Sequence, residues 1–79
     1  MNNLETELKN IFKNIFKINL NKISKKTNYK NTKNWDSLNH VKLIMAIESK
    51  FKLSIDPDQS INFTSFDQII KYLRKNKLY

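Results

Sequence analysis

The spacing of apolar residues predicts a helix over the first part of the chain. Between residues 4 and 16 the apolar positions recur every three or four residues, as one face of a helix requires. Asn2 followed three residues later by Glu5 fits a capping box at the helix start, and we expect this helix to end near Ile18. The apolar face consists of Leu4, Leu8, Ile11, Phe12, Ile15 and Phe16.

A long polar segment, residues 19–34, follows this helix and predicts a loop. Asparagine, lysine, serine and threonine dominate it, which is typical of irregular structure. Leu20, Ile23 and Tyr29 are spaced apolar residues that we expect to anchor it on the core. A loop of this length is uncommon in so small a domain and is often functional.

Residues 37–51 predict a second helix with two apolar stripes. Successive helical residues lie about 100° apart, which groups Leu43, Ile44, Ile47 and Phe51 in one stripe suited to the core. A second stripe, centred roughly 140° away on the same wheel, is formed by Leu38, Val41 and Met45. Either the helix lies between two layers, or it leaves an apolar strip for a ligand or partner.

The remaining residues predict one short and one longer helix. Pro57 suits the first position of a single helical turn ending near Ser60, while residues 52–55 give only a weak indication of a strand. Ser65 and Gln68 have the spacing of a capping box, and the helical repeat behind them consists of Phe66, Ile69, Ile70 and Leu73. We therefore predict one all-α domain over residues 1–79: a small bundle of three main helices plus one short helix.

Composition excludes several classes of protein. The 79 residues contain no cysteine and one histidine, so we expect no disulfide and no metal site. No apolar run approaches the roughly 18 residues of a membrane span. The first residues lack the basic-then-apolar order of a signal peptide, and we expect a cytoplasmic protein.

The net charge of +8 raises the question of a polyanionic partner. Lysine, asparagine and isoleucine, all with codons rich in A and T, make up 36 of the 79 residues. The lysines spread from Lys9 to Lys77, which favours a compositional bias over one binding patch. A basic helical module that binds nucleic acid stays an alternative, although its recognition helix should expose basic or amide side chains.

Two residues at the start of the second helix suggest a site. Asp36 and Ser37 are both suited to capping a helix, and capping alone would explain them. Ser37 has no evident base and acid partner that would make it a catalytic nucleophile. His40 lies towards the core side of the helix, where a packing role is more usual. We therefore expect no enzyme.

The run Asp36-Ser37-Leu38, with HVKLIMAIESKF and then SIDPD after it, resembles the acyl carrier protein family over nearly the whole chain. In that family the motif serine carries 4′-phosphopantetheine, derived from coenzyme A, through a phosphodiester. The resemblance implies that Ser37 is the attachment residue and that Asp36 and Leu38 flank it. An acyl or aminoacyl unit would be held there as a thioester.

The resemblance also implies partners: a phosphopantetheinyl transferase, acyl-loading enzymes and acyl-transfer enzymes. The residues expected to dock them are Leu38, Val41, Lys42 and Met45. We expect a monomer that neither binds nucleic acid nor inserts into a membrane. A carrier-fold interaction protein without the arm is a further alternative.

Three departures from the family pattern bear on the kind of pathway that such a carrier would serve. Glycine is absent, and Asn34 and Lys52 stand near positions where carriers often have it. Trp35 precedes the motif where a small residue is usual. Lys42 and Lys50 replace acidic residues of the second helix. Because like charges at a docking surface weaken association, we expect a specialised pathway with dedicated enzymes.

Overall fold

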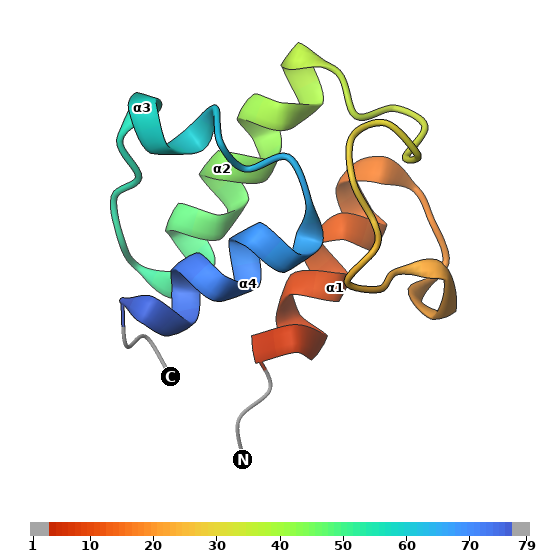
Figure 1. Cartoon of the computed structure of the whole chain (residues 1–79), viewed down its shortest axis with the longest axis horizontal. Helices are drawn as coiled ribbons and strands as arrows, with labels where there is room; N and C mark the ends of the chain where they lie inside the picture. Colours follow the sequence, from red (N-terminus) through yellow and green to blue (C-terminus); the bar gives the residue numbers. More distant parts are fainter. Residues whose placement is uncertain (1–3, 77–79) are drawn as a thin grey trace.

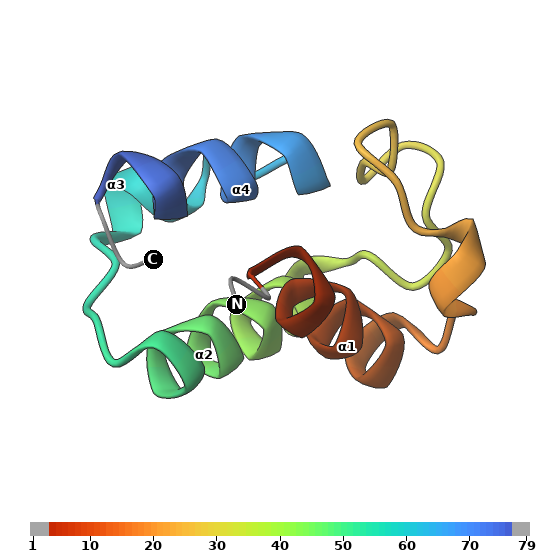
Figure 2. The same cartoon turned by 90° about the horizontal axis from the view of Figure 1, so that it is seen from below.

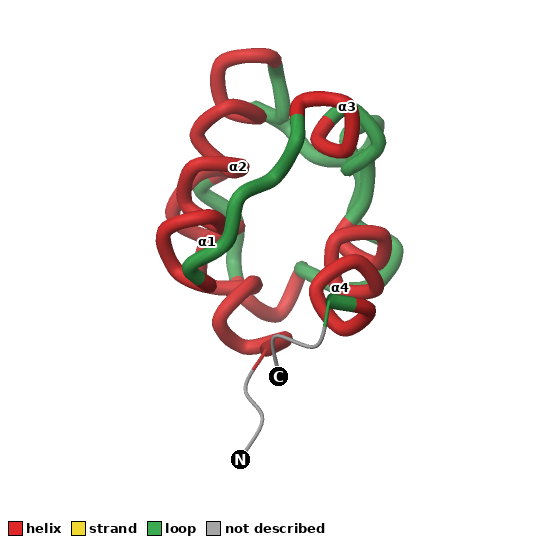
Figure 3. Tube along the Cα trace, turned by 90° about the vertical axis from the view of Figure 1, so that its left-hand side faces the viewer, coloured by secondary structure: helices red, strands yellow, loops and turns green. Residues whose placement is uncertain are grey.

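The computed structural model describes residues 4–76, and within them it confirms the predicted all-α bundle (Figure 1). Its helices are α1 (Leu4–Phe16), the 3₁₀ turn η1 (Leu20–Lys22), α2 (Ser37–Phe51), α3 (Pro57–Ser60) and α4 (Phe66–Lys75). Helices α1 and α2 lie side by side in one layer, and α3 and α4 form the other (Figure 2, Figure 3).

The core fills the space between these layers with one apolar face from each main helix. Its fully buried residues are Leu4, Leu8, Phe12, Phe16, Leu43, Ile47, Phe66, Ile69, Ile70 and Leu73. Ile15, which belongs to the predicted apolar face of this helix, is only half-buried, whereas its neighbour Phe16 is completely buried. Phe12 anchors the aromatic part of this core, with edge-to-face contacts to Phe16 and Phe66 at 5.3 and 5.2 Å between ring centroids.

The end of α1 differs from the prediction. The helix stops at Phe16 instead of near Ile18, because Lys17 adopts the left-handed region with φ 60°. The Lys17 amide still donates to the carbonyl of Lys13 at 2.9 Å, which satisfies an orphan carbonyl of the last turn. The proposed cap residue Asn2 lies outside the described residues.

The loop between α1 and α2 is anchored differently from the prediction. Ile23 is buried, but Leu20 and Tyr29 are 40% and 48% exposed, so neither anchors the loop in the core. Backbone hydrogen bonds hold this part of the loop instead. The Phe66 amide donates to the Thr27 carbonyl at 2.8 Å, and the Tyr29 amide donates to the Thr64 carbonyl at 3.0 Å. The loop is thereby fixed to the start of α4.

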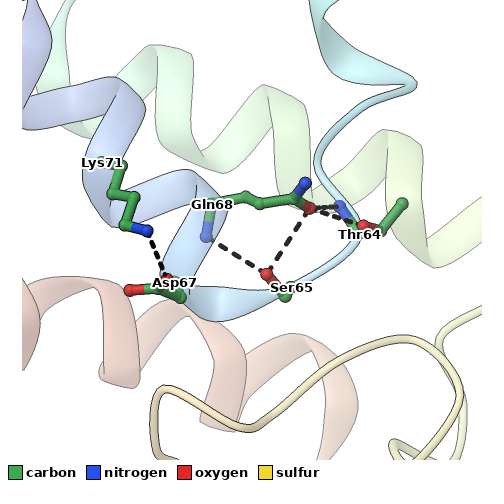
Figure 4. A network of polar contacts seen from close by, with 5 residues as sticks. All are labelled: Thr64, Ser65, Asp67, Gln68 and Lys71. Carbon is green, nitrogen blue, oxygen red and sulfur yellow. Dashed lines mark hydrogen bonds and ion pairs between the residues drawn. The ribbon is translucent and has the colours of Figure 1, made fainter.

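The start of α4 partly confirms the capping box (Figure 4). The Ser65 hydroxyl accepts from the Gln68 amide at 3.2 Å, as predicted. The Gln68 side chain, however, accepts from the backbone amide of Thr64 at 3.0 Å, one residue earlier than a capping box requires. Lys71 and Asp67 add an ion pair of 3.1 Å one turn apart.

No strand forms at residues 52–55, although their pattern weakly indicates one. Lys52 takes the left-handed conformation with φ 55°, and its amide donates to the Glu48 carbonyl, so it terminates α2. The Glu48 carboxylate then accepts from the Ile55 amide at 2.7 Å. This contact uses the backbone group that a ladder of strands would need.

Candidate functional site

Ser37 is the first residue of α2 and is exposed. The cap of this helix is Asp36, whose carboxylate accepts from the Asn39 amide at 2.9 Å. The Ser37 hydroxyl makes no hydrogen bond to another described residue. Helix capping therefore accounts for Asp36, whereas the hydroxyl group of Ser37 is available to react.

Asn34 fixes the direction in which the chain enters α2. It adopts the left-handed conformation with φ 73°, which asparagine tolerates better than most residues. Its side-chain amide donates to the Phe16 carbonyl at 3.3 Å, and its own carbonyl accepts from the Asn39 side chain at 2.8 Å. Asn34 thus adopts a left-handed conformation near a position where carriers often have glycine. Its hydrogen bonds also link the end of α1 to the start of α2.

Trp35 is a packing residue next to the site. Its ring stacks on Phe16 at 4.9 Å with an interplanar angle of 27°, and meets Phe12 edge-on at 5.4 Å. The indole N–H donates to Nδ1 of His40 at 3.1 Å. A large side chain therefore fills the space beside the core just before the Asp36-Ser37-Leu38 run.

His40 connects α2 to α3. Its Nε2 lies 2.8 Å from the Ser60 carbonyl oxygen. Because Nδ1 accepts from the Trp35 indole, Nε2 must carry the proton and donate to Ser60. Both ring nitrogens are in use, so His40 has no free nitrogen with which to activate Ser37.

The second apolar stripe of α2 lies on the surface. Leu38, Val41 and Met45 are 65%, 54% and 62% exposed, whereas Leu43 and Ile47 are completely buried. Of the two interpretations that the sequence left open, the structure supports an exposed apolar strip. This strip begins one residue after Ser37.

A groove of about 560 Å³ lies beside Ser37. It joins the start of α2 to the α1–α2 loop and to the segment between α3 and α4, and its apolar rim includes Tyr29, Val41 and Ile61. Ile61 is 71% exposed, which extends the apolar surface beyond α2. Sequence reasoning missed Tyr29 and Ile61 here, because no local pattern indicates which loop residues meet at the start of α2.

The charged residues of α2 differ in what they contact. Glu48 holds the Ile55 amide, and Lys50 lies 3.6 Å from a Glu7 carboxylate oxygen. Lys42 is exposed and has no ion pair with a described residue. Among the charged residues of α2 itself, the one beside the apolar strip that has no ion pair is therefore Lys42.

Comparison with known proteins decides the family. The family model described as the phosphopantetheine attachment site matches residues 6–73. The chain belongs to this family. It is therefore a non-catalytic carrier that holds a covalent 4′-phosphopantetheine group. Within residues 4–76, no helix is long and apolar enough to cross a membrane.

Two relatives are both named acyl carrier protein. The protein of Buchnera aphidicola subsp. Schizaphis graminum is 35% identical over 78 residues, covering 98% of this chain and 99% of the relative. That of Helicobacter pylori strain J99 is 42% identical over 43 residues, covering 54% of this chain and 55% of the relative.

The start of α2 has the chemistry that the phosphodiester of this group requires. The first amides of a helix have no intrahelical partner, and the helix dipole favours an anion there. Asp36 uses the amide of Asn39, which leaves those of Ser37 and Leu38 for an anion. The residues present therefore fit the group.

Proposed function

We propose that residues 1–79 form a single carrier domain with the phosphopantetheine arm on Ser37. The observation that carries this proposal is the division of roles at the helix start: Asp36 caps α2, while the Ser37 hydroxyl is exposed and unbonded. The arm would supply the thiol that holds an acyl or aminoacyl unit as a thioester. The chain itself has no cysteine for that purpose.

We further propose that the partners are a phosphopantetheinyl transferase and enzymes that load and transfer the acyl unit. They would dock on the apolar strip of Leu38, Val41 and Met45, which starts next to the attachment residue. A few well-packed side chains near the centre of an interface tend to carry most of its binding energy. Lys42 adds a positive charge to this surface, so a complementary partner would be acidic there. This charge supports dedicated enzymes of a specialised pathway.

Intact-mass measurement after incubation with coenzyme A and a phosphopantetheinyl transferase tests the attachment. The chain should gain the mass of one phosphopantetheine group. Ser37→Ala should abolish the gain while leaving helix content by circular dichroism almost unchanged. Ser49→Ala, which removes another exposed serine from α2, is the matched control and should keep the gain.

Modification of Ser37→Ala would refute the assignment of the arm to this residue. The protein isolated from its own host provides a second check, because there the natural transferase acts on it. An unmodified mass in that sample would contradict the proposed attachment to Ser37.

A further inference from the structure

A second cavity, of about 390 Å³, lies in the long loop between α1 and α2. Its volume falls within the range of about 300–1,000 Å³ that is typical of small-molecule sites. Three lysines and several hydroxyl and amide groups line it, and no acidic residue does. The lining consists of Ile18, Lys22, Ser24, Lys26, Thr27, Asn31, Thr32 and Lys33.

The surrounding segment carries the whole net charge of the protein. Residues 8–35 contain eight lysines and no aspartate or glutamate. The seven basic and seven acidic residues elsewhere cancel, which leaves the net +8 on this segment. A codon bias towards A and T raises lysine throughout a chain, but it does not remove acidic residues from one segment.

The lysines of this cavity have no acidic partner among the residues that the structure describes. The two ion pairs described within residues 4–76 join Lys50 to Glu7 and Lys71 to Asp67. Lys22, Lys26 and Lys33 are exposed and line a common cavity, so it presents three positive charges. A bound anion would be attracted by these charges.

Two hydroxyl groups add neutral donors to the cavity. The Ser24 oxygen accepts from the Lys26 amide at 3.1 Å, and the Thr27 oxygen accepts from the Ser24 amide at 2.9 Å. Neither hydroxyl donates its hydrogen to an acceptor among the described residues. Thr27 is buried, so its hydroxyl is held in place. Both groups can donate to a ligand without breaking a bond that shapes the loop.

Asn31 holds the loop in this shape. Its side-chain oxygen accepts from the Asn28 amide at 2.8 Å, and its side-chain nitrogen donates to the Lys26 carbonyl at 2.9 Å. The Asn28 side chain donates to the same carbonyl at 3.0 Å. A site whose backbone is already ordered loses less entropy when a ligand binds.

We propose that this cavity binds a small anion bearing two or more negative charges on phosphate groups, such as a diphosphate. Lysine binds phosphate as a compact point charge, and hydroxyls complete the donor set. Three ammonium groups match the charge of a diphosphate better than that of a singly charged anion. The site does not include Ser37 and does not depend on the arm.

The test uses the full chain with Ser37→Ala, so that the state of the arm cannot affect the result. Inorganic diphosphate, ADP and succinate are titrated separately by calorimetry at low salt, and amide chemical shifts locate the binding. We expect one diphosphate per chain, with shift changes concentrated between Ile18 and Lys33. ADP should bind through the same residues, and its affinity relative to diphosphate shows whether a nucleotide is preferred.

Paired lysine variants separate the cavity from the general positive field. Lys22→Gln with Lys33→Gln removes two cavity charges and should weaken diphosphate binding by about tenfold or more, because each charge-assisted hydrogen bond contributes substantially. Lys25→Gln with Lys30→Gln makes the same charge change in the same loop outside the cavity lining. This control should keep the affinity within about twofold.

Three results would overturn the proposal. An equal loss of affinity in both double variants would show a diffuse positive field instead of a site. Binding of succinate as tight as that of diphosphate would exclude phosphate as the recognised chemistry. Absence of diphosphate binding, together with tight binding of a single-stranded oligonucleotide, would assign the segment to nucleic acid.

Discussion

Truncating one residue from each apolar stripe of α2 should separate core from docking surface. Ile47 is completely buried, so Ile47→Ala leaves a cavity and should cost about 2–5 kcal/mol. Met45 is 62% exposed. Since full burial of such a side chain contributes about 1.5–3 kcal/mol, the buried part of Met45 should contribute about 1 kcal/mol or less.

These free energies predict a larger fall in melting temperature for Ile47→Ala than for Met45→Ala. In a domain of this size, 1 kcal/mol shifts Tm by about 4–8 °C. Ile47→Ala should therefore lower Tm by at least about 8 °C, and Met45→Ala by no more than about 8 °C. The total stability expected for 79 residues is only about 4–12 kcal/mol. Ile47→Val, which should cost about 0.5–1.5 kcal/mol, provides a core variant that stays folded.

The assay measures thermal unfolding by circular dichroism and the rate of enzymatic loading on the same samples. Met45→Ala should slow loading, and its melting temperature should lie closer to that of the unsubstituted protein than that of Ile47→Ala does. Ile47→Val should melt earlier but load normally wherever it is folded. If Met45→Ala melts as early as Ile47→Ala, the second stripe contributes to the core. If it neither melts earlier nor loads more slowly, the docking surface does not include Met45.

Two further predictions concern residues near the ends of α2. Trp35→Phe keeps an aromatic ring but removes the N–H that donates to His40, so it should lower the free energy of unfolding by about 1 kcal/mol. An unchanged Tm together with unchanged His40 ring resonances would show that this bond contributes nothing. Lys52→Gly should raise stability by about 0.5–1 kcal/mol in urea unfolding, because glycine adopts φ 55° without the strain of a side chain. Asn34→Gly is the contrasting variant, because it relieves the strain of a positive φ but loses the hydrogen bond to the Phe16 carbonyl. It should therefore not raise the stability. An equal gain in stability in both variants would contradict the role given to Asn34.

The position of Ser37 was predictable because it depends on local signals. A capping residue, the following helical repeat and the Asp36-Ser37-Leu38 run are all contiguous in the chain. The bounds of α2 and the turn opened by Pro57 followed for the same reason, since helix starts depend on neighbouring residues. The early end of α1 at Lys17 was missed, because a lysine carries no sign that it will adopt a left-handed conformation.

The amino-acid sequence by itself determined that α2 has two apolar stripes, because the angle between side chains on a helix is fixed by the backbone. Only the tertiary structure decided that the second stripe stays exposed, since that depends on where α1 and α4 pack. Only the tertiary structure shows the two hydrogen bonds of His40, one from Trp35 and one to Ser60. It likewise shows that Lys22, Lys26 and Lys33 line one cavity. Contacts of this kind depend on the folded path of the chain, which apolar periodicity and caps do not encode.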